Sequence, residues 1–542
     1  MLDWYKDAIF YEVSVKAFAD SDGDGSGDLR GLIGKLDYLR DLGVDALWLL
    51  PIFPSPLRDD GYDVADYTDI HPRFGTLDDF KALLVEAHKR DLRIIVELVI
   101  NHTSDQHPWF QASRDPQHPD HARYRDWYVW SDTDQRYTET RIIFLDTEPS
   151  NWTFDPVRGQ YFWHRFFSHQ PDLNYDNPEV QRAMLRVVQY WIDLGADGFR
   201  IDAPPYLYER EGTNCENLPE THAYLKRLRA FVDAYAPGTF LLSEANMWPE
   251  EVIQYFGDGD EMHMNYHFPL MPRIFLALAK ADRAPILAIM ARTPDLPEPC
   301  QWGTFLRCHD ELTLEMVTPE DRAFMWDFYA PEPRMRLNLG IRRRLTPLLD
   351  NDRRRIEVAN SMLLTLIGSP FIYYGDEIGM GDNIWLDDRD GVRTPMQWDA
   401  GPNAGFSDAP AENLYAPVID DAVFGYRQVN VAAQRADEGS LWHWMQRVLA
   451  IRKQHPVFGR GTLRFLEPYN STILAYVRSD GAQTILVFNN LSAKSQHVTV
   501  DLRAYTGKVP RDLLADVVWD SIGGTPYTFT LTPYGYLWLA LE

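Results

Sequence analysis

Short apolar runs alternate with helical patterns along most of this chain, and this alternation constrains its fold more than any other feature. Eight runs are predicted to be strands: residues 9–15, 46–50, 93–100, 198–202, 239–244, 262–268, 304–310 and 370–377. Helical spacing of apolar residues occurs between several of them, at residues 29–42, 77–90, 179–194, 221–235 and 353–366. Strand–helix alternation favours a parallel sheet covered by helices. Eight such units predict a (β/α)8 barrel of the TIM type.

Three stretches interrupt the alternation and predict the domain organisation. Residues 103–172 are loop-like and rich in tryptophan, which indicates a domain inserted after the third strand, between barrel segments 1–102 and 173–456. Residues 311–360 are charged and are predicted to be a helical lid or subdomain, in which the arginine runs 342–344 and 353–355 form a solvated face. After residue 456, short alternating runs predict an all-β, antiparallel C-terminal domain at residues 457–542.

The charge and the cysteines bound the expected partners and location. The 542 residues carry 53 basic and 80 acidic side chains, a formal net charge of −27. Nucleic acids and anionic membranes attract basic faces, so neither is expected as a partner. Three cysteines without metal-type spacing suit a reducing compartment. The first residues lack the apolar core of a signal peptide and no apolar run approaches the roughly 20 residues of a membrane span, so a cytoplasmic location is expected.

Three carboxylates stand at the ends of predicted strands four, five and seven: Asp202, Glu244 and Asp310. In barrels of this kind the functional side chains come from the carboxyl ends of several strands, which meet at one mouth. Carboxylates held close together there raise one another's pKa, so one can stay protonated as a general acid while another is ionised. Cleavage of a glycosidic bond needs such a pair. A single carboxylate at a strand end is more often a helix N-cap, but three near arginine and histidine favour catalysis.

Several segments resemble, in chain order, the motifs of the α-amylase superfamily of glycoside hydrolases. They are residues 97–102 (ELVINH), 198–202 (GFRID), 242–246 (LSEAN), 305–310 (FLRCHD) and 368–377 (GSPFIYYGDE). Residues 170–174 (QPDLN) resemble the oligo-1,6-glucosidase-like branch. The matches run over almost the whole chain. Glu97 stands where many relatives have aspartate and Cys308 where many have asparagine, and neither is a catalytic position by this resemblance.

The resemblance implies a role for each of the three carboxylates. Asp202 is the expected nucleophile and Glu244 the acid/base, while Asp310 binds sugar hydroxyls and stabilises the transition state. Arg200, two residues before Asp202, is expected to keep the nucleophile ionised. The glucose subsite is expected to be lined by His102, Arg200 and His309.

A further motif implies that one end of the pocket is closed. Residues 59–63 (DDGYD) resemble the family's pocket-blocking loop, in which Asp59 grips the terminal glucose and Tyr62 stacks on it. Arg393 is the expected partner of Asp59. A blocked pocket implies exo action on small sugars.

An acidic, glycine-rich loop predicts a metal site. Oxygen ligands occupy every second position: Asp20, Asp22, Asp24, Ser26 and Asp28. This pattern suits a hard cation such as Ca²⁺. The loop is not an EF-hand, because its twelfth position is Gly31, and the alternative is a solvated acidic turn. The resemblance implies calcium here, with Ser26 donating its carbonyl.

The resemblance also implies a second calcium site between the barrel and the inserted domain. Its expected ligands are Asn101, Asp172, Tyr206, Leu207 and Glu209, with Tyr206 and Leu207 acting through carbonyl oxygens. The alternative is that Asn101 only hydrogen-bonds the loop. No organic cofactor is expected.

Two longer strings narrow the expected reaction. Residues 101–110 and 205–222 resemble the superfamily members that isomerise maltose to trehalose. The implied reaction is reversible intramolecular transfer of a glucosyl group through a covalent glucosyl-enzyme, with some hydrolysis to glucose. The inserted domain and residues 311–360 are expected to close over the site, and Asn246 to contact the second glucose.

Other functions remain as alternatives at this point. A retaining, exo-acting α-glucosidase or oligo-1,6-glucosidase needs the same residues. Superfamily members that bind membrane proteins without catalysis are disfavoured by the intact carboxylates and by the missing membrane span. The expected partner is a small disaccharide, maltose or trehalose, and homo-oligomerisation and association with a maltokinase are left open.

Overall fold

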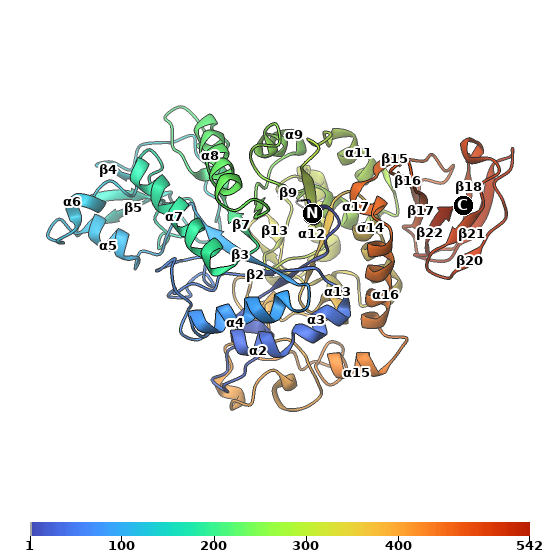
Figure 1. Cartoon of the computed structure of the whole chain (residues 1–542), viewed down its shortest axis with the longest axis horizontal. Coiled ribbons are helices and arrows are strands. Elements are labelled where there is room, and N and C mark those ends of the chain that lie inside the picture. Colours follow the sequence, from blue (N-terminus) through green and yellow to red (C-terminus); the bar gives the residue numbers. More distant parts are fainter. Residues whose placement is uncertain (1–2) are drawn as a thin grey trace.

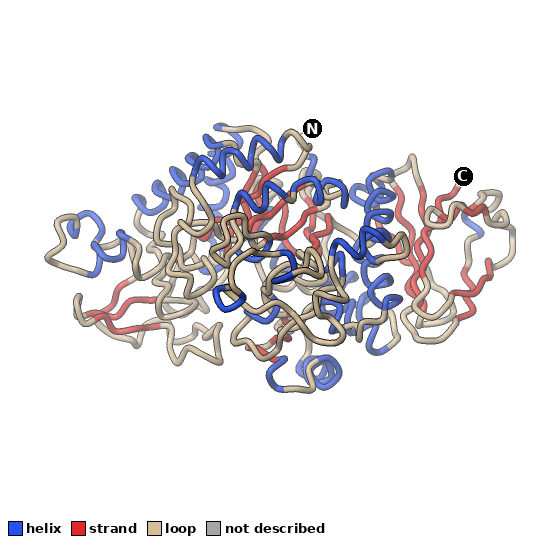
Figure 2. Tube along the Cα trace, turned by 90° about the horizontal axis from the view of Figure 1, so that it is seen from below, coloured by secondary structure: helices blue, strands red, loops and turns tan. Residues whose placement is uncertain are grey.

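Eight parallel strands close into a barrel at the centre of the computed structural model, which describes residues 3–542 (Figures 1 and 2). Their order around the barrel is β1-β14-β10-β9-β8-β7-β3-β2. The strands are β1 Phe10–Val13, β2 Ala46–Leu49, β3 Arg93–Val99, β7 Gly198–Asp202, β8 Phe240–Ser243, β9 Met264–Tyr266, β10 Gln301–Phe305 and β14 Ser369–Tyr373. Nearly all their residues are buried, as expected for strands covered on both faces. The predicted (β/α)8 barrel is confirmed.

Amphipathic helices cover the barrel and end where the sequence provides stops. The predicted ones are α2 Leu29–Gly34, α3 Leu36–Leu42, α4 Leu77–His88, α7 Pro178–Leu194, α8 Pro219–Tyr235 and α14 Arg353–Thr365. The predicted helix at 29–42 is therefore two helices, separated at Lys35. Thr76 and Asp79 form a capping box at the start of α4. Helices α3 and α7 end at Gly43 and Gly195, whose φ angles of 103° and 108° favour glycine.

The seventh strand of the barrel is shifted from its predicted position. The sequence predicts residues 304–310, whereas β10 ends at Phe305. Residues 306–310 form a loop above the strand ends, and this loop carries His309 and Asp310. Leu306 is buried without belonging to a strand, so the apolar run continues past the point where pairing ends.

Residues 103–172 project from the barrel after β3 (Figure 1). They contain α5 Pro108–Arg114, α6 His121–Tyr124 and a three-stranded sheet of order β4-β6-β5, formed by Trp130–Ser131, Gln160–Trp163 and Trp152–Asp155. Isolated bridges between His102 and Asp172 and between Tyr128 and Leu173 fasten both ends of the segment together. The structure thus contains the inserted domain after the third strand that the sequence predicted.

Residues 311–360 are only partly helical. They contain α12 Pro319–Tyr329, α13 Leu345–Leu348 and a small sheet of β11 Leu312–Thr313, β13 Gly340–Ile341 and β12 Arg336–Leu337. The prediction that residues 342–344 form a solvated face is wrong, because Arg342 and Arg344 are buried. Arg342 Nη1 donates to Leu386 O at 2.8 Å and Arg344 Nη1 to Tyr374 O at 2.7 Å. Backbone carbonyls of residues distant in the chain accept hydrogen bonds from both arginines, and the local sequence does not reveal these partners.

Beyond α16 Leu441–Gln454 and α17 Val457–Arg460 the chain forms two antiparallel sheets. The larger has the order β15-β16-β17-β22-β19-β20, from Thr462–Phe465, Ile473–Ser479, Thr484–Asn490, Tyr536–Leu541, Pro510–Asp512 and Val517–Val518. The smaller pairs β18 Gln496–Val500 with β21 Tyr527–Leu531. They enclose a separate apolar core. The predicted all-β C-terminal domain is confirmed.

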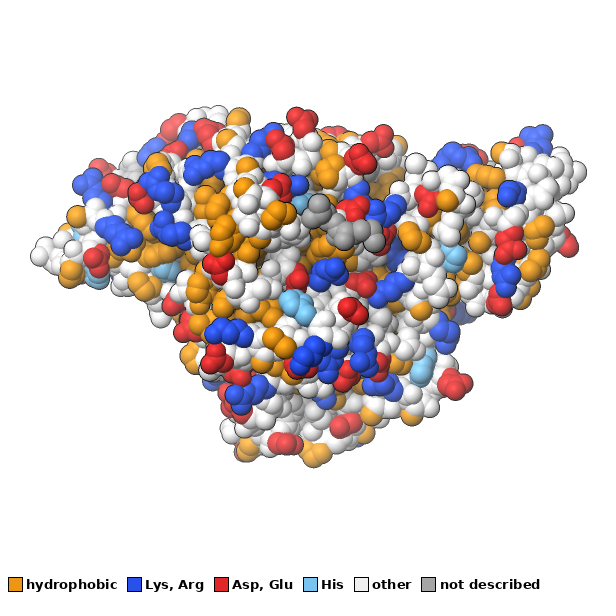
Figure 3. Space-filling model, in the orientation of Figure 1, with side chains coloured by type: hydrophobic (Ala, Val, Ile, Leu, Met, Phe, Trp, Pro, Cys, Tyr) orange, Lys and Arg blue, Asp and Glu red, His pale blue; other side chains and the backbone are white. Residues whose placement is uncertain are grey.

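The surface carries both signs of charge despite the net excess of acid. In Figure 3 basic and acidic side chains lie interspersed over the visible face, with no broad patch of either sign. The three cysteines are buried and unpaired. Within residues 3–542 the helices are all too short or too polar to cross a bilayer.

Candidate active site

Side chains from the carboxyl ends of the barrel strands line one cavity of about 940 Å³, including its open mouth. The predicted residues on its wall are Asp59, Tyr62, His102, Arg200, Asp202, Glu244, Asn246, His309 and Asp310. Glu12 and Arg389, which the sequence analysis did not identify, also line it. The three predicted catalytic carboxylates, far apart in the chain, therefore converge on one space.

One guanidinium holds two of the carboxylates. Arg200 Nη1 donates to Asp202 Oδ1 at 2.5 Å, and Nη2 lies 2.7 Å from Glu244 Oε2. Nη1 also donates to Glu97 Oε1 at 2.6 Å, while Trp48 Nε1 donates to Glu97 Oε2 at 2.7 Å. Glu97 therefore contacts Arg200 through one carboxylate oxygen and Trp48 through the other. The shared guanidinium therefore holds Asp202 and Glu244 beside each other on the cavity wall.

Glu244 is placed to carry a proton at neutral pH. Burial raises the pKa of Glu244 to about 8; the carboxylates of Asp202 and Asp310 add to this effect and Arg200 opposes it. At pH 7 the protonated form therefore dominates. A protonated carboxyl beside a second carboxylate is the arrangement that a general acid requires.

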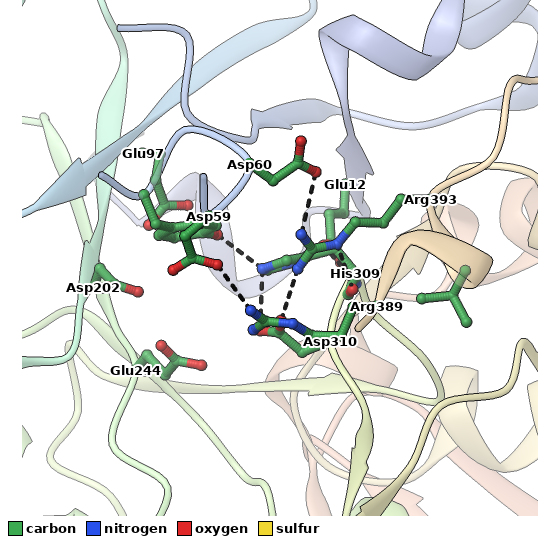
Figure 4. Close-up of polar contacts among 12 residues, drawn as sticks. Glu12, Asp59, Asp60, Glu97, Asp202, Glu244, His309, Asp310, Arg389 and Arg393 are labelled. Carbon is green, nitrogen blue, oxygen red and sulfur yellow. Dashed lines mark hydrogen bonds and ion pairs between the residues drawn. The ribbon is translucent and has the colours of Figure 1, made fainter. Parts of the chain in front are cut away.

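Asp310 is surrounded by positive groups. Its Oδ1 accepts from Arg389 Nη1 at 2.8 Å and from Arg393 Nη2 at 3.0 Å, and its Oδ2 lies 3.1 Å from His309 Nε2. Burial alone would raise the pKa of Asp310, but His309 and the two arginines hold it well below its usual range. Asp310 is therefore an anion poised at the cavity wall (Figure 4).

The prediction that Arg393 pairs with Asp59 is wrong. Asp59 Oδ1 accepts from Arg389 Nη2 at 2.8 Å, whereas Arg393 donates to Asp60 Oδ2 at 3.2 Å and to His309 O at 2.9 Å (Figure 4). The turn Asp390–Val392 lies between the two arginines. Both donate to Asp310, but of the two neighbouring aspartates Arg389 reaches Asp59 and Arg393 reaches Asp60. Two arginines four positions apart offered no signal in the sequence to decide which reaches Asp59.

Tyr62 and His102 also lie on the wall of the cavity. The Tyr62 ring stacks on His309 with centroids 5.4 Å apart and 9° between planes. Burial lowers the pKa of His102 to about 4, so this ring is neutral. Asn101 Nδ2 lies 3.3 Å from His102 Nδ1, and His102 Nε2 is buried without a hydrogen-bond partner in residues 3–542. If Asn101 donates, Nε2–H is the free donor toward the cavity.

The inserted domain and residues 311–360 meet above the cavity. Arg141 Nε lies 2.9 Å from Glu216 Oε1, and Arg141 Nη1 lies 3.1 Å from Glu315 Oε2. Asn246 Nδ2 donates to Thr313 Oγ1 at 3.4 Å. Phe144, Phe166 and Glu315 themselves line the cavity. These contacts join the two segments that the sequence predicted to close over the site.

The loop at residues 20–28 gathers part of the predicted metal site. Carboxylate oxygens of Asp20, Asp22 and Asp28 lie within 4.8 Å of one another. Asp24 lies outside this group, and its Oδ1 accepts from Ser26 N at 2.7 Å. No lysine or arginine of the described residues forms an ion pair with the three. Oxygen-only donors at this spacing fit a hard cation such as Ca²⁺.

The second predicted set is buried between barrel and inserted domain. Within the described chain, Asn101 Oδ1, Asp172 Oδ2 and Glu209 Oε1 are buried without hydrogen-bond partners. Burial raises the pKa of Asp172 to about 8 and that of Glu209 well above its usual range. Tyr206 and Leu207 are buried just before Glu209. Buried unsatisfied oxygens are costly, so their convergence fits a bound cation.

Comparison with known proteins gives consistent matches over the chain. Residues 12–324 and 341–461 match the α-amylase catalytic domain, and residues 463–538 match the C-terminal domain of maltogenic amylases. Trehalose synthase/amylase TreS of Mycobacterium tuberculosis (strain ATCC 25618 / H37Rv) is 58% identical, over 99% of this chain and 90% of its own length. Trehalose synthase of Pimelobacter sp. (strain R48) is 57% identical, over 99% and 96%.

Relatives with other names are more distant. Oligo-1,6-glucosidase of Parageobacillus thermoglucosidasius is 31% identical over 91% of each chain. Among solved structures, trehalulose synthase MutB from Pseudomonas mesoacidophila MX-45 has a TM-score of 0.79 at 26% identity, covering 99% of both chains. The α-glucosyl transfer enzyme XgtA has a TM-score of 0.79 at 28% identity over the whole of both chains.

Proposed function

The chain belongs to the α-amylase family, and from that premise we propose that it is a trehalose synthase, which isomerises maltose reversibly to trehalose. The observation that carries this proposal is the difference in sequence identity between two groups of relatives. Relatives named trehalose synthase share 54–58% of their residues over 99% or more of this chain, whereas relatives named α-glucosidase or oligo-1,6-glucosidase share 29–34%.

The first half of the reaction transfers the glucosyl unit to the protein. A carboxylate oxygen of Asp202 attacks the anomeric carbon of the non-reducing glucose, and the bond from that carbon to the bridging oxygen breaks. Glu244 gives its proton to this oxygen, so free glucose and a β-glucosyl ester of Asp202 result. The raised pKa of Glu244 supports its role as the proton donor.

The second half returns the glucosyl unit to the same glucose. The freed glucose turns within the pocket, and its anomeric hydroxyl attacks the ester while ionised Glu244 takes the proton. Two inversions leave the configuration α at the transferred unit, so maltose becomes α,α-trehalose. Water in the same position produces two glucose molecules instead, which explains why exclusion of solvent decides the product ratio.

Binding of the transferred glucose involves the remaining wall residues. Asp59 and Asp310 accept from sugar hydroxyls, His102 Nε2 donates, and Tyr62 stacks on the ring. The ion pair of Asp59 with Arg389 supports a closed end to the pocket. A closed end favours disaccharides over long chains. Hydrogen bonds that strengthen as the sugar flattens toward the oxocarbenium ion lower the barrier.

We also propose two calcium ions that stabilise the loops around the barrel. Asp20, Asp22 and Asp28 would hold one, with the Ser26 carbonyl. Asn101, Asp172 and Glu209 would hold the other, with the carbonyls of Tyr206 and Leu207. The ions neutralise carboxylates at both places and take no part in the bond-making steps.

The three unpaired cysteines support a reducing, cytoplasmic location.

A maltose assay with purified protein separates this function from the α-glucosidase alternative. Trehalose in excess over glucose is the expected result, and dominant glucose would favour the glucosidase. Repeating the assay in excess isotopically labelled glucose tests the intramolecular path, for which trehalose should contain little label. The Glu244→Gln variant is the matched negative control.

A further inference from the structure

Glu12 is a buried carboxylate at the base of the catalytic cavity to which the proposed reaction gives no role. It lies on β1, is 1% exposed and lines the cavity. Its Oε1 accepts from the backbone N of His309 at 3.0 Å and from His309 Nδ1 at 2.5 Å. Among residues 3–542, His309 is the basic side chain within ion-pair distance of Glu12. A buried carboxylate is costly unless it is paired with a positive charge, so this contact calls for an imidazolium.

The other nitrogen of the same ring faces a second carboxylate. His309 Nε2 lies 3.1 Å from Asp310 Oδ2 and 2.9 Å from the Tyr62 hydroxyl. Ionised carboxylates only accept hydrogen bonds, so a hydrogen on each ring nitrogen is needed to satisfy both sides. Two aromatic rings pack against the imidazole and restrain it: Tyr62 stacks on it, and Trp48 lies edge-on with ring centroids 5.7 Å apart.

We propose that Glu12 is a positioning residue that locks the His309 ring in place and keeps it doubly protonated, so that Nε2–H is always available to Asp310 and to a hydroxyl of the bound glucosyl unit. This inference rests on the proposed glucosyl transfer. A neutral ring with its hydrogen on Nδ1 would present Nε2 as an acceptor and would lose its attraction for Asp310. Glu12 therefore acts on the substrate through His309.

The charges around His309 favour this state. Burial would lower the pKa of His309, but Asp310 and Glu12 raise it to about 9. Asp60 and Glu244 also interact with its charge. Two nearby arginines disfavour the positively charged ring: Arg393, whose Nε donates to His309 O, and Arg389, which donates to Asp310. Since the raised pKa depends on Glu12, removal of that charge lowers the pH at which the ring loses its second hydrogen.

Glu12→Gln tests the proposal because glutamine keeps an acceptor for Nδ1 and removes only the charge. Glu377→Gln is the matched control: Glu377 is a buried carboxylate of the same barrel that accepts from the Tyr11 and Tyr38 hydroxyls and does not line the cavity. In protein labelled with ¹³C at the histidine ring, the His309 signal is identified by its loss in His309→Gln. We expect it to titrate near pH 9 in the wild type and in Glu377→Gln, and at least one pH unit lower in Glu12→Gln.

Kinetics with α-glucosyl fluoride supply the second measurement. Fluoride leaves without a proton from Glu244, so the titration of Glu244 no longer limits kcat/KM at high pH. We expect the alkaline limb to move down by at least one pH unit in Glu12→Gln, with a raised KM, and to stay in place in Glu377→Gln. An unchanged His309 titration in folded Glu12→Gln overturns the proposal, as does a loss of rate that is uniform across pH. A wild type that titrates as expected but converts neither maltose nor the fluoride instead removes the proposed function.

Discussion

At the scale of single residues, Glu244 sets the pH range of the proposed reaction. Its folded-state pKa of about 8 is above the usual value for glutamate, so the acid form is present below pH 8 and is lost above it. We therefore expect kcat/KM for maltose to fall about tenfold per pH unit above pH 8, on a profile measured by trehalose release. Glu244→Gln should lower the rate by roughly 10²–10⁴-fold and abolish this limb. A variant with full activity would mean that the proton comes from elsewhere.

Arg389 is the second residue whose loss has a clear expected effect. It bridges Asp59 and Asp310 with one hydrogen bond of 2.8 Å to each. Removal of one partner from a buried ion pair costs about 2–5 kcal/mol, so Arg389→Ala should reduce kcat/KM for maltose by roughly 30-fold or more. Arg389→Lys keeps the charge but cannot donate to both carboxylates as the guanidinium does. Its kcat/KM should therefore lie between those of the wild type and Arg389→Ala. Steady-state kinetics check this order, and a wild-type kcat/KM in Arg389→Ala would contradict it.

Residues such as Asp202 and Glu244 could be found from the sequence because strand ends and motifs mark their positions. Arg389 and Glu12 could not. Arg389 differs from Arg393 only by the turn between them, and Glu12 sits inside a strand that the pattern marks as core. Their roles come from contacts across 330 and 297 positions of chain, respectively, which no local pattern encodes.

At the scale of elements, Arg141 links the two segments that meet above the cavity, the inserted domain (residues 103–172) and residues 311–360; together they are called the roof below. This residue belongs to the inserted domain and pairs with Glu315 of the 311–360 segment. Arg141→Ala should loosen the roof, admit water and raise the ratio of glucose to trehalose several-fold with a smaller effect on maltose consumption. Arg136→Ala is the matched control, because Arg136 belongs to the same inserted domain but pairs with Glu211 and not with a residue of 311–360. The ratio of glucose to trehalose, measured by chromatography, tests this prediction. Equal ratios in Arg141→Ala and Arg136→Ala would exclude a role of Arg141 in keeping water out of the cavity.

Strands and helices with strong periodicity were predictable, whereas elements defined by distant contacts were not. Most predicted helices lie within a few residues of their observed positions. The short strands β11, β12 and β13 carry too few residues for a period-two pattern. The burial of Arg342 follows from the carbonyl of Leu386 that meets it, 44 positions away. The charged composition of residues 342–344 wrongly suggested a solvated face, because the hydrogen-bond partner that allows Arg342 to be buried lies in another segment.

At the scale of the whole molecule, the C-terminal domain and the barrel form a continuous structure. Trp538 Nε1 donates to Ser361 Oγ of α14 at 2.9 Å, and buried Arg478 donates to Thr365 O at 2.8 Å, at the end of the same helix. Figure 1 shows this domain beside α14 and α16, at the opposite end of the molecule from the inserted domain. The domain therefore reinforces the barrel wall and lies away from the cavity mouth.

The proposed calcium on the loop at residues 20–28 should contribute to the stability of this whole assembly. Asp20 joins the loop to a distant segment, since its Oδ2 accepts from Ser407 Oγ at 2.6 Å and its backbone N donates to Phe406 O at 2.9 Å. A ligand that binds only the folded state stabilises it by about 2.7 kcal/mol at 100 times its Kd. We expect a chelator to lower the midpoint of thermal unfolding by a few degrees and excess Ca²⁺ to restore it.

A variant assigns this effect to the loop rather than to the second proposed ion. In Asp22→Asn one carboxylate is lost, and Asp22 makes no ion pair in the described chain, so the fold itself loses little. The variant should need more Ca²⁺ for the same recovery of the midpoint, while Asp501→Asn, which removes an exposed partner of Arg503 in the C-terminal domain, should respond as the wild type does. Thermal unfolding followed by circular dichroism across a Ca²⁺ titration gives both curves. If Asp22→Asn and the wild type recover at the same Ca²⁺ concentration, the three aspartates form an acidic turn and bind no structural metal.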